Sequence, residues 1–361
     1  ARLRPCKAYS DTLSTSLSIP SRALGTRERA DDARCRGCHC RRCRRCRRCR
    51  RCWLPARMRF RARLMYDGLA YAGLQFQENA PSIANELQVA LAKRTQQDVR
   101  VIAAGRTDTG VHARGQAIHF DVDGDRFSDD PEAFQTAVNC MLPQDVRLVQ
   151  LERAQERDAE GRRWHSMYWA TGKLYSYRFH SGHPIGCMDP TQRLYRHQER
   201  RGPLCLDRMQ AAADYFVGEH DFASFANKGA TGVRQSPAGA RLPSLSTVRR
   251  VRSITIHDEG DGYARADVHL KGALYKQVRN MVGLLFEVGD GRREATDVPD
   301  LMALRSRTGL PKPAPALGLT LESVYYNVGW DGAYRHPLHT DTVGLGGDAG
   351  SLLRVMPEPE G

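Results

Sequence analysis

The densest group of polar residues that could do chemistry lies in the segment GRTDTGVHARGQAIHFD, from Gly105 to Asp121. This segment connects an apolar run to an alternating one, which predicts a loop at the rim of a β-sheet, where a rigid scaffold can hold reactive groups. Its first carboxylate is Asp108, and the polar side chains beside it are Arg106, Thr107 and His112. Asp108 is either a catalytic carboxylate or a residue that caps neighbouring amides in a tight loop, and the loop alone leaves both interpretations open.

A metal site is another interpretation of the same segment. Two carboxylates and two histidines fall within 14 residues, namely Asp108, His112, His119 and Asp121, and these residue types can bind a divalent metal for hydrolysis. His119 and Asp121 would share one face of a strand. Asp108 and His112 lie on a glycine-rich loop that does not fix their spacing. The pattern therefore favours a site without a metal, and a metal-dependent hydrolase is the less favoured interpretation.

The apolar pattern predicts the elements that would position this loop. Strands are expected over 59–66, 99–105, 116–122, 146–152, 173–180, 248–258, 263–271 and 319–327. The run 99–105 is typical of a buried strand, whereas 116–122 alternates as a half-exposed strand. Helices are expected after the capping residues Ser82, Asp130 and Asp207, and over 272–289. Strands that outnumber helices and meet through short turns indicate an antiparallel-rich α+β sheet.

Charge and cysteine are concentrated at the front of the chain. Residues 1–57 hold 17 of the 55 Lys and Arg but only 4 of the 41 Asp and Glu. This segment therefore carries most of the net charge of +14. Eight of the 11 cysteines precede Met58, most of them separated by pairs of arginines. Such spacing can bind zinc, but the segment lacks the apolar residues to fold around a metal. We expect a disordered, low-complexity leader, either a transit peptide or a misassigned start.

The rest of the chain divides into two expected α+β halves and a tail. The first half, 58–165, carries the Asp108 loop, the second covers 166–327, and 328–361 has no hydrophobic period and is expected to be loose. No window reaches the roughly 18–20 apolar residues that a membrane-spanning helix needs, so no membrane partner is expected. The few cysteines after Met58 favour an intracellular protein, in the cytoplasm or, if the leader is a transit peptide, in a mitochondrion or plastid.

The loop and five further motifs resemble the TruA-type tRNA pseudouridine synthases. GRTDTGVHA matches that family's G-R-T-D-x-G-V-H-A. The other motifs are MYDGLAYAGLQFQ (65–77), KLYSYRF (173–179), FVGEHDFASF (216–225), LYKQVRNMVG (274–283) and APALGLTLESVYY (314–326), in the family's order. The resemblance implies the pseudouridine synthase fold, in which two similar α+β halves carry helices on one side of the sheet and an RNA-binding cleft on the other.

By this resemblance the chain converts uridine to pseudouridine in the anticodon stem-loop of tRNA, at positions 38–40, with Asp108 as the catalytic carboxylate. The reaction moves the base from N1 to C5 with no net redox change, so no cofactor is implied. A catalytic carboxylate must be ionised and held still, and Arg279 is its implied partner, although a pair between Arg279 and Glu287 would satisfy that arginine as well. Tyr175 would stack on the target base.

The resemblance also implies which residues touch the RNA. Arg106, Thr107, His112 and Lys276 would bind the substrate once the uridine has been flipped out of its helix, although His112 fits an ordinary loop histidine equally well. Basic stretches at 193–208 and 241–252 are candidates for phosphate contacts. The family suggests a homodimer, in which two nearly neutral bodies would join their basic patches.

Three features depart from the family's pattern. Met167 stands where the family usually has Arg, Ala84 stands where Gln is common, and the segment after Phe225 looks like an insertion. These differences affect the expected RNA contacts and the choice of uridine. A catalytically inactive RNA-binding protein is the alternative function, but binding alone does not require Asp108, Tyr175 and Arg279 together.

Overall fold

The computed structural model describes residues 57–326, except 125–126, 128, 183–187, 228–233, 236–240 and 243–245. The expected leader, apart from Arg57, and the expected tail lie outside these described residues. Among the helices that are described, none has the length and apolar character to cross a membrane.

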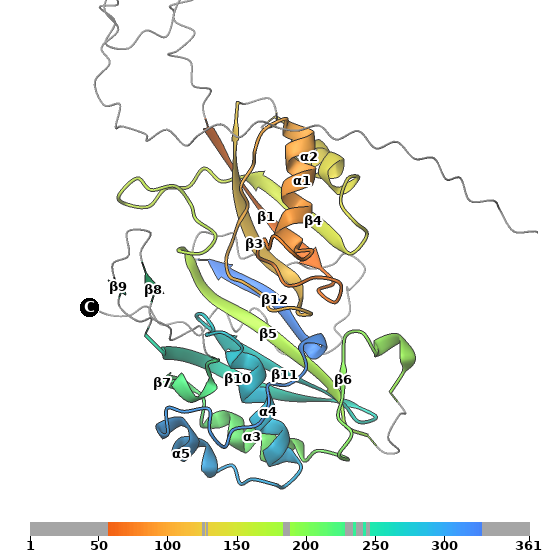
Figure 1. Ribbon diagram of the computed structural model, residues 1–361, viewed down its shortest axis with the longest axis vertical. Coiled ribbons are helices and arrows are strands. Elements are labelled where there is room, and N and C mark those ends of the chain that lie inside the picture. The colour runs from red at the N-terminus through yellow and green to blue at the C-terminus, as the bar shows by residue number, and fades with distance from the viewer. Residues whose placement is uncertain are drawn as a thin grey trace, which may run out of the picture. The chain divides into compact units, whose positions relative to one another are not determined.

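One mixed sheet of ten strands runs through the described residues (Figure 1). Its main order is β4-β1-β3-β12-β5-β11-β10-β7, with β2 paired to β3 and β6 paired to β5. The strands are β1 Arg57–Tyr66, β2 Ile102–Ala103, β3 His112–Asp123, β4 Val146–Arg153, β5 Ala170–His180, β6 His197–Gln198, β7 Gly218–Asp221, β10 Val248–Gly260, β11 Tyr263–Leu270 and β12 Leu319–Tyr326, and a separate pair is formed by β8 Arg234–Gln235 and β9 Arg241–Leu242. Among the described strands, only the β3–β12 and β5–β6 pairs are parallel, so the antiparallel-rich α+β fold is confirmed.

Five α-helices accompany the sheet, two in the first half and three in the second (Figure 1). They are α1 Ile83–Thr95, α2 Pro131–Asn139, α3 Leu206–Asp214, α4 Gln277–Gly289 and α5 Asp297–Ala303. Ser82 and Asp130 cap α1 and α2 as predicted, because each side chain accepts a hydrogen bond from an amide in the first turn. Asp207 was predicted wrongly as a cap. It lies inside the first turn of α3, and Cys205 is the N-cap residue.

Helix α4 begins later than the predicted 272. Lys276, just before its first residue Gln277, has a left-handed backbone with φ of 60°, and a residue in that conformation cannot continue a right-handed helix. Once started, α4 is buried over most of its length, and its Phe286 packs against Tyr177 of β5 with ring centroids 5.8 Å apart. The late start leaves residues 273–276 as a loop that faces the Asp108 segment.

Two predictions about β2 and β3 were also wrong. The expected buried strand 99–105 reduces to the two residues of β2, which are half-buried. β3 is covered on both faces rather than half-exposed, since His119 is 1% exposed and Ile118 is fully buried. The covering residues come from the connection between β4 and β5, where Trp164 packs edge-on against the His119 ring at 6.0 Å.

Candidate active site

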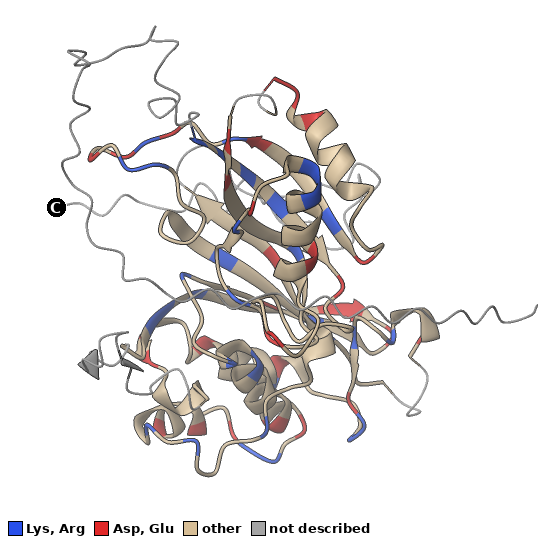
Figure 2. Cartoon of the chain, turned by 45° about the horizontal axis from the view of Figure 1, so that its top comes forward, with Lys and Arg blue, Asp and Glu red and all other residues tan. Residues whose placement is uncertain are grey.

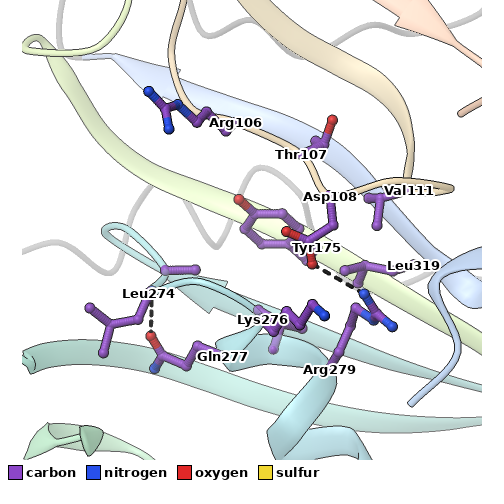
Figure 3. A pocket seen from close by; sticks show the side chains of 12 residues that line it. Arg106, Thr107, Asp108, Val111, Tyr175, Leu274, Lys276, Gln277, Arg279 and Leu319 are labelled. Atoms are coloured by element: carbon purple, nitrogen blue, oxygen red, sulfur yellow. Dashed lines mark hydrogen bonds and ion pairs between the residues drawn. The ribbon is translucent and has the colours of Figure 1, made fainter. Parts of the chain in front are cut away.

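A pocket of about 350 Å³ lies between the β2–β3 loop and the segment that leads into α4. The predicted site residues among its lining are Arg106, Thr107, Asp108, Tyr175, Lys276 and Arg279 (Figure 3). Tyr175 lies on the same face of β5 as Tyr177, which packs on α4. The pocket therefore opens on the face that carries α4, whereas the expected binding cleft was on the side without helices.

Asp108 and Arg279 form an ion pair inside this pocket. Arg279 Nη1 donates to Asp108 Oδ2 at 3.2 Å, and the two side chains are 13% and 19% exposed. Arg279 Nε also donates to the carbonyl oxygen of Ala314 at 2.7 Å, and the Ala314 amide donates back to the Arg279 carbonyl at 2.9 Å. The guanidinium is thus held in place from behind, and its contact with Oδ2 fixes the position of the Asp108 carboxylate. The alternative partner, Glu287, pairs instead with Arg292 and Arg293.

Tyr175 supplies the aromatic wall of the pocket. It projects from the middle of β5 next to Asp108 in Figure 3, and it is 7% exposed. Burial, with smaller contributions from Tyr66 and Asp108, raises the pKa of the Tyr175 phenol above its ordinary value. The phenol therefore stays protonated at neutral pH, and the residue offers a flat ring rather than a phenolate. Tyr177 and Phe179, fully buried on the same strand, belong to the core.

Comparison with known proteins identifies the family. A family model described as tRNA pseudouridine synthase matches residues 212–327. The chain is 36% identical to tRNA pseudouridine synthase A of Ruminiclostridium cellulolyticum over 273 residues, 74% of this chain and 99% of that protein. It is 34% identical to tRNA pseudouridine synthase A of Chlamydia muridarum, over 73% of this chain and 90% of that protein. It is also 34% identical to the synthase A of Brevibacillus brevis, over 74% of this chain and 99% of that protein. The chain belongs to the TruA-type tRNA pseudouridine synthases. It is an isomerase that acts on uridine in tRNA.

The remaining polar residues of the synthase pocket hold its loops or face its opening. Thr107 is buried, and its Oγ1 lies 2.8 Å from the Tyr66 hydroxyl; burial raises the pKa of Tyr66 to about 12. Arg106 is exposed. Lys276 is half-buried, with its Nζ 5.2 Å from the centre of the Tyr275 ring. Arg106 is thus a solvent-facing cation of the lining, whereas Lys276 is partly covered.

His112 is not among the residues that line the synthase pocket. It is 3% exposed, its Nδ1 accepts a hydrogen bond from the Gly68 amide at 3.2 Å, and its Nε2 lies 3.1 Å from the Leu317 carbonyl. Burial lowers the pKa of His112, so the neutral ring donates from Nε2 to that carbonyl. His112 therefore connects β3 to the residues just before β12. It does not line the pocket, where a substrate contact was predicted.

Lys173, which was not predicted as a site residue, supports the catalytic loop from behind. It is 8% exposed, and its Nζ donates to the carbonyl oxygen of Ala104 at 2.9 Å. A Cβ at Gly105 would lie 2.3 Å from that Nζ, so only glycine leaves room for the amine. Gln116 Nε2 donates to the Gly105 carbonyl at 2.8 Å. Lys173 is the first residue of the K-x-Y-x-Y motif, and this membership was the sequence signal that could have indicated a role at the site. The role itself depends on a contact between residues 69 positions apart in the sequence.

The residues of the possible metal site each contact different protein groups. Asp121 accepts hydrogen bonds from Arg59 at 2.8 and 2.9 Å, and His119 Nδ1 lies 2.8 Å from Ser166 Oγ. Burial, with smaller effects from nearby charges, lowers the pKa of His119 to about 3. Within the described residues, no group of three or more His, Cys, Asp or Glu side chains is arranged to hold a metal ion.

Proposed function

We propose that Asp108 is the catalytic carboxylate of this synthase, that Arg279 and Tyr175 complete the site, and that the modified uridines lie in the anticodon stem-loop, at positions 38–40. The observation that carries the catalytic assignment is the 3.2 Å contact between Asp108 and Arg279 beside the Tyr175 ring in one pocket. A carboxylate, a fixed cation and a stacking surface are the three groups that isomerisation of a flipped pyrimidine requires.

The reaction balances without a cofactor. The bond between N1 and C1′ breaks, the base rotates, a bond forms between C5 and C1′, and the proton lost from C5 is replaced by one gained at N1. Asp108 assists by attacking the sugar, by attacking the base or by removing a sugar proton, and each route uses the ionised carboxylate. Arg279 holds the carboxylate in place through their ion pair, and the protonated Tyr175 ring holds the base by stacking.

The RNA-facing roles follow from exposure. A uridine stacked in a helix cannot reach Asp108, so it must be flipped at a cost of a few kcal/mol. Arg106, which is exposed, and Lys276, which is partly covered, both line the pocket and are placed to contact phosphates or to fill the vacated space. Thr107 and His112 are proposed to hold the loop rather than the RNA, because their polar atoms are engaged by protein groups.

The anticodon stem-loop and a homodimer are the finer parts of the proposal, and both rest on the family. Lys and Arg lie among Asp and Glu over both halves of the described chain (Figure 2), and residues 58–361 hold 38 Lys and Arg against 37 Asp and Glu. Two copies could join moderate patches into one longer RNA groove. Sedimentation of the full chain at micromolar concentration should give twice the mass of one chain, and a species of one-chain mass that modifies tRNA at full rate would contradict the dimer.

The function is tested with unmodified tRNA transcripts. Incubation with the full chain, followed by chemical labelling of pseudouridine, should map product to positions 38–40, and replacing these uridines with cytidines should remove the signal. Asp98→Asn, which changes an exposed acid of the same half, serves as a matched control and should modify as the parent does. Folded enzyme that modifies only uridines outside the anticodon arm would refute the proposed specificity.

A further inference from the structure

A column of three rings runs from the core of the first half to its surface, away from the pocket. His119, 1% exposed, lies edge-on against His165 with ring centroids 4.5 Å apart. His165 stacks in turn on Tyr168 at 4.2 Å with an interplanar angle of 26°. Tyr168 is 80% exposed, so one face of its ring is covered by His165 and the other faces solvent. The column ends on an unoccupied aromatic face.

The second ring of this column is held rigidly. His165 Nδ1 accepts hydrogen bonds from the amides of Met167 and Tyr168, at 3.1 and 3.3 Å. Burial, followed by the charge of Arg59, lowers the pKa of His165, which matches a neutral ring whose Nδ1 acts as an acceptor. Because the supporting ring is fixed by the backbone, Tyr168 presents its free face with little loss of side-chain entropy on binding.

The surroundings of the column are cationic. Arg57, Arg59, Arg157 and Arg163 gather around two acids, of which Asp121 pairs with Arg59 and Arg163 and Asp123 pairs with Arg57. Burial lowers the pKa of Arg163, and repulsion from the other three arginines adds to this, although Asp121 acts in the opposite direction. Around Arg163, three other arginines therefore act against one carboxylate, and a further anion would relieve the repulsion. An open ring beside surplus arginines is the combination that binds nucleic acid.

We infer that Tyr168 is a stacking platform for an unpaired base of the tRNA substrate, outside the catalytic pocket. Tyr168 is not among the residues that line the pocket. It precedes β5, within which Ala170 and Tyr175 are already about 16 Å apart at about 3.3 Å per residue. A base at Tyr168 is therefore not the flipped uridine but another part of the same RNA. The inference rests on tRNA as the substrate and is independent of the role proposed for Asp108.

A second copy of the chain is the competing occupant, and charge argues against it. Cores of protein interfaces are depleted of charged residues, whereas Arg59 and Arg163 lie beside the His119 ring of this column and share one carboxylate, Asp121. Two such patches would also repel each other if they met face to face. The RNA backbone, in contrast, supplies the anions that the patch lacks while its bases supply the rings.

The test measures tRNA affinity of the full chain by filter binding. Tyr168→Ala should raise Kd about 5- to 100-fold, the loss expected for one stacked base, while Tyr168→Phe and Tyr168→Trp stay within threefold of the parent because they keep the ring. The slope of log Kd against log salt should not change in Tyr168→Ala, because no phosphate contact is removed. Tyr215→Ala, at a 40% exposed tyrosine after α3, is the matched control and should bind as the parent does.

Three outcomes would overturn the inference. Unchanged affinity of Tyr168→Ala would mean that no base stacks there. Equal losses in Tyr168→Phe and Tyr168→Ala would mean that the hydroxyl, not the ring, is recognised. A change in sedimenting mass of Tyr168→Ala would assign the ring to a contact between chains. Single-turnover modification by Tyr168→Ala with saturating enzyme should keep the parent's rate, which separates this test from the catalytic proposal.

Discussion

Replacing Lys173 with methionine tests the buried amine behind the catalytic loop. Burial lowers the pKa of Lys173 from 10.5 to about 8, which corresponds to about 3 kcal/mol at about 1.4 kcal/mol per pKa unit. Methionine fills a similar volume without a charge, but it leaves the Ala104 carbonyl without its 2.9 Å donor, at a cost of about 1–3 kcal/mol. The two effects oppose each other, so Lys173→Met should fold with a stability near that of the parent at neutral pH.

The pH dependence of stability distinguishes the two proteins. Between pH 8 and 10.5 the unfolded parent holds the Lys173 proton and the folded parent releases it, so its unfolding free energy rises with pH by up to about 1.4 kcal/mol per unit. Lys173→Met lacks this gain. Urea unfolding at a series of pH values should show the parent gaining about 3 kcal/mol relative to the variant over that range, while the exposed control Lys271→Met tracks the parent.

Activity should fall although stability does not. Ala104 and Gly105 lead directly into the Asp108 loop, and losing their anchor lets the carboxylate shift. Misplacement by about 1 Å can cost about 100-fold in rate, so we expect kcat of Lys173→Met to fall about 10- to 100-fold with little change in KM. Stability profiles that run parallel in parent and variant, together with an unchanged kcat, would refute the role of Lys173.

Three further predictions concern the ion pair, the loop glycine and a buried histidine. Arg279→Met leaves Asp108 without its partner and should lower the single-turnover rate about 100- to 1,000-fold, which corresponds to about 3–4 kcal/mol of lost transition-state stabilisation, with tRNA affinity within threefold; a rate near the parent's would contradict the pair. Gly105→Ala should displace the amine of Lys173 and lower kcat, and the double variant with Lys173→Met should be no worse than the poorer single variant; additive losses would show that the two positions act separately. His119 stays neutral in the fold with a pKa of about 3 against an ordinary 6.5, so the unfolding free energy should fall by up to about 1.4 kcal/mol per unit as pH drops from 6.5 toward 3, less steeply in His119→Gln; equal slopes would assign acid sensitivity elsewhere.

Local patterns predicted the elements whose ends are set by nearby residues. The strand predicted over 59–66 and the caps Ser82 and Asp130 are such cases, because a short strand or an N-cap depends on a few neighbours. The start of α4 escaped prediction because Lys276 takes a left-handed conformation, although the residues on both sides of it suit a helix. The burial of His119 was not predicted either, because the side chains that cover it come from the β4–β5 connection, which is distant in the sequence.

The candidate site shows the same division. The family's motifs pointed to Asp108, Tyr175 and Arg279, and the structure brings all three into one pocket although they lie far apart in sequence. Motif membership does not distinguish a residue that faces the ligand from one that supports the loop. His112 and Lys173 both lie in such motifs, and only their contacts with Leu317 and Ala104 reveal supporting positions.

The most direct test of the account is the behaviour of Asp108→Asn. This change keeps the size of the side chain and removes its charge, so the variant should bind tRNA transcript with a Kd within threefold of the parent. Single-turnover reactions with enzyme in excess should then yield no labelled pseudouridine after many parent half-times. Isomerisation by the folded Asp108→Asn variant at a rate comparable to the parent's would show that another group does the chemistry, and the assignment of Asp108 would be wrong.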